Sequence, residues 1–141
     1  MTLRVFVAGP EDAAVFAGPA AEDVFDGPCP PDRVKAYLAD PRLHMVLATE
    51  DDRLVGMCSG VHYFHPDKPN EMFINELGVA PTHRRRGIAT QLVHAMCDLA
   101  RGLECQAAWV ISDPTDTALG FYRSLNVRQD GEHLAMFTID L

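Results

Sequence analysis

The chain has 141 residues, of which 48% are hydrophobic and 23% are charged, so we expect one globular domain, residues 1–141, with a sizeable core. Twenty acidic residues against twelve Lys and Arg give a net charge of −8. This balance argues against nucleic acid or an anionic membrane as a partner, and it favours a cationic one.

Two further classes of protein are disfavoured by pattern. No apolar run reaches the length of a membrane span, and the N-terminus is broken too early for a secretory signal, so we expect a cytoplasmic protein. The cysteines contain no C-x-x-C pair: Cys29, Cys58, Cys97 and Cys105. Four of the histidines share no metal-ligand spacing: His62, His65, His83 and His133. We therefore expect reduced thiols and no metal.

The first third of the chain is divided into short elements by Gly and Pro. A strand is predicted over residues 3–7, where apolar and polar residues alternate. Short helices are predicted over residues 11–16, 20–25 and 32–40. Asp32 is the predicted cap of the third helix.

The middle of the chain predicts a hairpin followed by a central strand. The hairpin strands cover residues 43–49 and 54–64, and a polar loop follows over residues 65–70. The central strand, residues 73–79, contains a single acid, Glu76. Pro81 ends it, because Pro has no N–H to give to a ladder.

A basic turn and a long amphipathic helix come next. Apolar residues recur at spacings of three and four: Ile88, Leu92, Ala95, Met96 and Leu99. The helix follows Arg84-Arg85-Arg86-Gly87 and ends near Gly102. A helix start offers unpaired N–H groups and the positive end of the macrodipole. Gly87 has no Cβ in the way of a ligand, so the turn predicts a site for phosphate oxygens.

The last third predicts two or three strands and one helix. Residues 105–112 form a continuous apolar run, as in a strand buried on both faces. Residues 113–116 are predicted to cap a helix that runs to Leu125. Short strands are expected near Val127 and over residues 134–141. The sum is an α/β fold, a mixed sheet of six or seven strands with helices on both faces.

Two segments resemble a known family. Arg84-x-x-Gly87-x-Ala89, placed between a strand and a helix, resembles the acyl-CoA motif of the GNAT superfamily of N-acetyltransferases. The segment from Ala118 to Val127 resembles that family's later helix, with Asn126 where Gly is usual. Asn tolerates left-handed backbone, so the helix end is compatible with the change. The resemblance implies the GNAT fold, in which two central parallel strands splay apart.

The resemblance also implies acetyl-CoA as co-substrate and assigns its binding residues. These are Leu77, Gly78, Val79, Arg84, Arg85, Arg86, Gly87, Ile88, Ala89, Thr90 and Phe121. It implies Glu76 as the general base, the alternative being a surface acid paired with an arginine. It implies Tyr122 as the acid that protonates the leaving thiolate, the alternative being a core tyrosine. Asp113 and Asp116 are candidates for binding a cationic acceptor or for capping the helix.

Three functions remain open. From Leu54 onward the order of features is most similar to aminoglycoside 3-N-acetyltransferases of the gentamicin-modifying type. The first function is therefore acetyl transfer to a small cationic amine, an aminoglycoside being one choice. The second is acetylation of a protein N-terminus or lysine, and the third is an acyl-CoA-binding module without turnover. The family's habits also imply a homodimer.

Overall fold

The computed structural model describes residues 2–132 and 134–141. The chain divides into two compact units, Met1–Val110 and Ile111–Leu141. The prediction of one domain stays a prediction. Among the described residues, no helix combines the length and the apolarity needed to cross a membrane.

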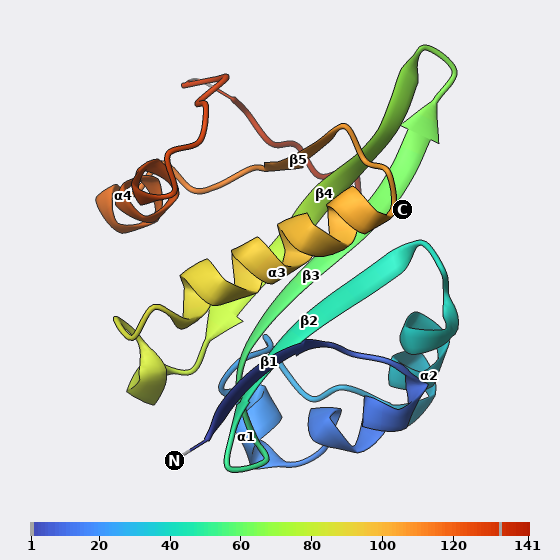
Figure 1. Ribbon diagram of the computed structural model, residues 1–141, viewed down its shortest axis with the longest axis vertical. Helices are drawn as coiled ribbons and strands as arrows, with labels where there is room; N and C mark the ends of the chain where they lie inside the picture. Colours follow the sequence, from blue (N-terminus) through green and yellow to red (C-terminus); the bar gives the residue numbers. More distant parts are fainter. Residues whose placement is uncertain (1, 133) are drawn as a thin grey trace. The chain divides into compact units, whose positions relative to one another are not determined.

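The first unit is built on a five-stranded sheet with its strands in chain order (Figure 1). The strands are β1 (Leu3–Val7), β2 (Leu43–Glu50), β3 (Arg53–His65), β4 (Lys68–Val79) and β5 (Ala107–Val110). β1 to β4 pair antiparallel, and β5 pairs parallel to β4. The α/β class and the mixed sheet are confirmed, but the expected six or seven strands are five in the described part of the chain.

Tight turns make the hairpins longer than predicted. Asp51 and Asp52 join β2 to β3 with φ values of 50° and 65°, the left-handed backbone that matches the twist of a two-residue hairpin. β4 begins at Lys68, which pairs with His65. The polar loop predicted over residues 65–70 is therefore mostly strand, because the turn needs only two residues.

The helices and helical turns are η1 (Pro10–Phe16), α1 (Pro19–Glu22), α2 (Pro31–Ala39), η2 (Pro81–His83), α3 (Ile88–Gly102) and α4 (Asp116–Ser124). The first predicted helix is a 3₁₀ helix. The prediction that Asp32 caps α2 is wrong, since the N-cap is Pro30 and Pro31 takes the first helical position. Pro fits there because its fixed φ is already helical and its missing N–H would have had no partner.

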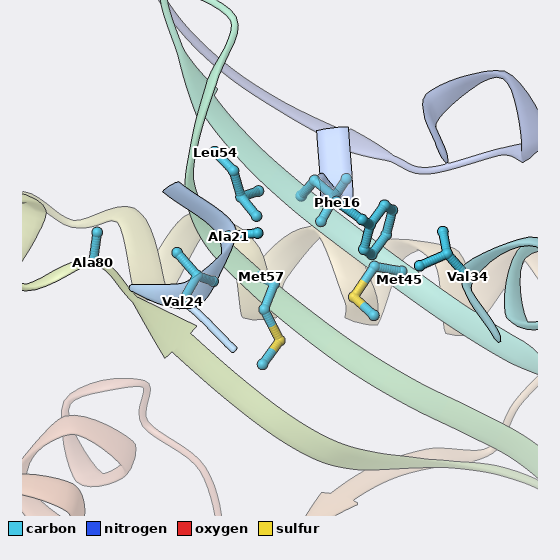
Figure 2. Close-up of a cluster of buried hydrophobic side chains, with 9 residues drawn as sticks. Phe16, Ala21, Val24, Val34, Met45, Leu54, Met57 and Ala80 are labelled. Atoms are coloured by element: carbon cyan, nitrogen blue, oxygen red, sulfur yellow. The ribbon is translucent and has the colours of Figure 1, made fainter. Parts of the chain in front are cut away.

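Helices cover both faces of the sheet, as predicted. α3 lies across one face and buries Ile88, Leu92 and Met96, as its periodicity predicts (Figure 1). The opposite face carries a cluster of side chains from η1, α1, α2 and the strands (Figure 2). Met45 and Leu47 of β2 belong to this cluster, whereas the buried Val46 and Ala48, which alternate with them, point to the other face. The sheet is thus a central layer between two layers of helix.

β5 differs from its prediction. It has four residues, and Ala107, Ala108 and Trp109 are exposed rather than buried on both faces. β5 is an edge strand, so an apolar sequence there does not mean burial. The Trp109 side chain, which we expected in the core, packs against Phe73 with ring centroids 4.5 Å apart and stays 38% exposed.

The second unit contains α4 and, in the other described residues, chain without regular secondary structure. Thr115 is the N-cap of α4, and its hydroxyl accepts from the Ala118 N–H at 3.3 Å. Asn126 has a φ of 58°, which confirms the left-handed helix exit. The strands predicted near Val127 and over residues 134–141 are wrong for the described residues. An alternating sequence becomes a strand only where its backbone groups pair with a neighbour, whereas Met136 in this segment is 87% exposed.

Candidate active site

β4 extends beyond the end of its parallel partner, β5. The pairing of β4 with β5 runs from Glu71 with Ala107 to Ile74 with Val110 and goes no further in the described residues. On its other side β4 stays paired with β3 as far as Val79. All four residues of β5 are paired, and β4 continues beyond them to Val79; the splay implied by the resemblance stays a prediction.

The last residues of β4 direct alternate backbone groups to its two sides. The Glu76 N–H donates to Ser59 Oγ at 3.1 Å and the Ala80 N–H donates to the Val55 carbonyl at 2.8 Å, both on β3. Since the direction alternates along a strand, the N–H and C=O groups of Leu77 and Val79 point away from β3. These groups are the predicted partners of an extended acyl-CoA arm.

Gly78 permits a close approach. A Cβ at Gly78 would lie 2.5 Å from the Val24 carbonyl oxygen, so no other residue fits without movement of the backbone. The chain after α1 is thus packed directly on the last part of β4.

The start of α3 forms a concave turn of backbone. Gly87 is the N-cap with φ 76° and ψ 10°, and Arg85 also has a positive φ, 61°. The first intrahelical bond runs from the Gln91 N–H to the Gly87 carbonyl at 3.2 Å. The N–H groups of Ile88, Ala89 and Thr90 precede that bond and have no carbonyl one turn earlier in the helix to accept from them.

The surroundings of this turn suit an anion. Arg84, Arg85, Arg86 and Gly87 are exposed, and a Cβ built on Gly87 would meet nothing within 4 Å. No acidic residue lies in the first turn of α3. The helix dipole, the free N–H groups and the arginines together form a cradle that fits a phosphate group. The geometry is compatible with the predicted phosphate turn, residues 84–90, which stays a prediction.

Arg86 and His83 are tied to β2. Glu50 accepts from Arg86 Nη2 at 2.8 Å and Nη1 at 3.3 Å, and it pairs with His83 Nε2 at 2.5 Å. Arg86 and then His83 lower the pKa of Glu50 to about 2. Sequence reasoning missed Glu50 because nothing local marks an acid at a strand end as the partner of a loop 36 residues away.

Glu76 lies on the α1 and α2 face of β4. The neighbouring Gly78 faces Val24 on that side, and side chains two apart share a face. Glu76 is exposed. The Tyr37 hydroxyl of α2 donates to the His44 carbonyl at 2.6 Å. Burial raises the pKa of Tyr37 to about 12, with smaller contributions from Cys58 and Glu76. Tyr37 and Ser59 are neighbours of Glu76 that the sequence did not indicate.

Tyr122 and Phe121 belong to α4 in the second unit. Their rings meet edge to face with centroids 4.9 Å apart, and both side chains are partly buried. Asp113 is exposed, and the helix cap that was one option for it is made by Thr115. The Asp116 side chain and His133 lie outside the described residues. Leu77–Val79 and residues 84–90 belong to the first unit, whereas Asp113, Phe121 and Tyr122 belong to the second.

The described His, Cys, Asp and Glu side chains were the candidates for metal ligands. Among the described residues, no three His, Cys, Asp or Glu side chains are grouped to hold a metal ion. Cys29, Cys58, Cys97 and Cys105 are free thiols. Burial raises the pKa of Cys58 to about 12, so it stays protonated.

A mixed sheet in which β4 runs past the end of its parallel neighbour β5, followed by an exposed, arginine-rich helix start, is compatible with the fold of the acyl-CoA-dependent acetyltransferases. The chain belongs to the acetyltransferase (GNAT) family, whose model matches residues 16–126.

Individual relatives agree on the family and differ in their acceptors. An N-alpha-acetyltransferase RimI from Mycobacterium tuberculosis is 32% identical over 74% of this chain, a match that spans 64% of that protein's length. An aminoglycoside acetyltransferase from an uncultured soil metagenomic sample, solved with sisomicin, has a TM-score of 0.81 at 19% identity, covering 99% of this chain and 96% of its own. Aminoglycoside N-acetyltransferase AAC(6')-Iy, solved with CoA, has a TM-score of 0.78 at 17% identity, with the same coverage. At such identities the two structures establish the fold.

Proposed function

We propose that the chain is an N-acetyltransferase that moves an acetyl group from acetyl-CoA to a primary amine of a small cationic acceptor, an aminoglycoside being the leading choice. The observation that carries the proposal is the cradle at the start of α3, directly after a strand whose Leu77 and Val79 backbone groups point away from β3. The thioester of acetyl-CoA supplies the activated acetyl group.

The cofactor would be held mainly by backbone. The N–H groups of Ile88, Ala89 and Thr90 face the pyrophosphate, with Arg84 and Arg85 adding charge. Leu77 to Val79 bind the extended arm as an added strand would, and an N–H there donates to the carbonyl oxygen of the acetyl group as it gains charge.

Two side chains would handle the protons. Glu76 takes a proton from the acceptor's ammonium group, which frees the nitrogen lone pair to form the new C–N bond. The C–S bond breaks, Tyr122 gives its proton to the departing sulfur, and the second proton that the nitrogen loses as the amide forms returns to the Tyr122 oxygen. Asp113 and Asp116 attract the cationic acceptor, in keeping with a net charge of −8.

A protein N-terminus is the second candidate acceptor. The observation that favours it is the 32% identity to an N-alpha-acetyltransferase, higher than that to the aminoglycoside enzymes. The aminoglycoside reading rests instead on structural likeness along nearly the whole chain and on the acidic charge. An acyl-CoA-binding module without turnover is the third candidate.

The deciding experiment measures release of free CoA from acetyl-CoA with a panel of amines. Sisomicin and other aminoglycosides form one arm, and peptides with a free alanine N-terminus form the other. We expect turnover with an aminoglycoside and none with the peptides. Turnover with peptides alone would move the assignment to protein acetylation. Tight CoA binding without turnover on any amine would favour the binding module. The homodimer stays a proposal, which sedimentation of the purified chain tests.

A further inference from the structure

We infer that Glu50 is a positioning residue for acetyl-CoA, which holds the turn before α3 in the shape that presents its N–H groups to the pyrophosphate. The inference rests on the proposed function, and it gives a role to a residue that lies outside the acyl-CoA motif. Glu50 acts through His83 and Arg86 and does not itself face the ligand.

Glu50 is a fixed anchor. It is the last residue of β2 and is in register with Leu3 of β1 and Arg53 of β3. The two-residue turn through Asp51 and Asp52 follows at once. Its side chain is only 10% exposed although it is charged. A carboxylate held on a paired strand is a better anchor for a loop than one on another loop.

The Glu50 carboxylate contacts the turn before α3 at two residues, His83 and Arg86. His83 ends η2, and Arg86 directly precedes the N-cap Gly87, so the two contacts enclose Arg84 and Arg85. Arg86 binds with both terminal nitrogens, the geometry that fixes direction as well as distance. The network continues to Thr82, whose Oγ1 lies 2.8 Å from His83 Nδ1. A neutral His83 with its proton on Nε2 satisfies both contacts, donating to Glu50 and accepting from Thr82.

The turn needs to be held. Arg85 has a φ of 61°, a conformation that costs free energy for a residue with a side chain. Residues 84–87 are exposed, so they have little apolar burial to fix them. Downstream, Ile88 is anchored in the core at 1% exposure. Upstream, the partly buried His83 and its bond to Glu50 supply the anchor.

Two physical effects of Glu50 oppose each other, and this makes the inference testable. As a negative charge near a phosphate site, Glu50 weakens CoA binding, and removing it would strengthen binding. As a clamp, Glu50 keeps the cradle organised before the ligand arrives, and removing it weakens binding. Whether CoA affinity rises or falls when Glu50 is neutralised therefore shows which of the two effects dominates.

The test is calorimetric titration of CoA into the wild type and three single variants. Glu50→Gln removes the charge, and Glu50→Asp keeps the charge but is too short to reach both partners. Asp52→Asn is the matched control, because it removes one negative charge from the adjacent exposed turn and Asn tolerates the φ of 65° found there. We expect Kd to rise roughly three- to tenfold in both Glu50 variants and to stay unchanged in Asp52→Asn.

A double variant and kinetics complete the design. Arg86→Gln should raise Kd by a similar factor, and Glu50→Gln with Arg86→Gln should add little to either single change. In steady state, KM for acetyl-CoA should rise while KM for the amine stays constant, which general destabilisation would not produce. Thermal unfolding of each variant confirms that it is folded at the assay temperature.

The outcomes are distinguishable. Tighter CoA binding by Glu50→Gln, or wild-type binding by Glu50→Asp, would overturn the clamp while leaving the proposed function intact. Wild-type protein that does not bind CoA, or a folded Gly87→Glu variant that binds it normally, would overturn the proposed function and the inference together.

Discussion

Gly87 combines two properties that a substitution can separate. Its φ of 76° disfavours any side chain, and its Cβ position is open, where the ligand is expected. We predict that Gly87→Glu abolishes measurable CoA binding, because a carboxylate would repel the pyrophosphate. Gly87→Ala should bind CoA and lose only about 1 kcal/mol of stability through the backbone term. Calorimetry on both variants measures the difference, and equal losses of affinity would show that backbone strain is the cause.

Glu76 is exposed, so its proposed role depends on the acceptor rather than on a buried environment. We predict that Glu76→Gln lowers turnover by ~10²–10⁴-fold near neutral pH with CoA affinity unchanged. The defect should shrink as pH rises, because the amine then loses its proton without help. A pH series of initial rates with the true acceptor tests this, and full activity in the variant at neutral pH would reduce Glu76 to a surface acid.

The turnover defect of a Tyr122 variant should not shrink as pH rises, in contrast to that of Glu76→Gln. We predict that Tyr122→Phe lowers turnover and leaves CoA affinity near that of the wild type, because the ring still packs against Phe121. High pH should not rescue it, since the departing thiolate then finds a proton less easily. Rescue at high pH by the same factor as in Glu76→Gln would contradict the separate roles of the two residues.

At the scale of elements, the contact between β4 and the chain after α1 depends on Gly78, because glycine has no side chain. The Cβ of an Ala at position 78 would lie 2.5 Å from the Val24 carbonyl oxygen. We predict that Gly78→Ala lowers the free energy of unfolding by about 1–3 kcal/mol, because backbone must move. Gly102→Ala is the matched control, since a Cβ there meets nothing within 4 Å and Ala favours the helix. Urea unfolding measures the unfolding free energy of both variants. Equal values for Gly78→Ala and Gly102→Ala would contradict the predicted steric clash at position 78.

The short elements were the hardest to predict. The periodicity of α3 identified Ile88, Leu92 and Met96, three of its five buried residues, because they repeat at helical spacing over about two turns. β5 and the segment over residues 134–141 have equally apolar sequences, yet they are exposed. An apolar sequence makes a segment suitable for burial, but whether the segment is buried depends on its position in the sheet.

At the scale of the whole molecule, two ion-paired carboxylates make stability depend on acid pH. The pKa of Asp40 is lowered from 3.8 to about 2 by Arg42, and that of Glu50 from 4.5 to about 2 by Arg86 and His83. Both groups bind protons more weakly in the folded state, so their contribution is full above about pH 4.5 and is lost as pH falls toward 2. We predict that the double variant Asp40→Asn with Glu50→Gln is less stable than the wild type at pH 7.

The same variant should approach the wild type in acid. Urea unfolding at a series of pH values measures the difference in unfolding free energy, which should narrow between pH 4.5 and 2. A difference that is constant across this range would show that the two carboxylates contribute by shape and not by charge.

The family and the α/β class followed from the sequence alone, because the motifs and periodicities that indicate them lie in neighbouring residues. Arg84 to Thr90 and the apolar periodicity of the helix after them are a local sequence pattern, which is why the position of this turn could be predicted. Three features could be seen only in the tertiary structure. Glu50 is hydrogen-bonded to Arg86, and Gly78 packs against Val24. Most of β5 is exposed. Those facts depend on the register and order of strands, which place residues far apart in sequence side by side. No local pattern encodes such a neighbour, because the free energy of the contact appears only once the sheet has formed.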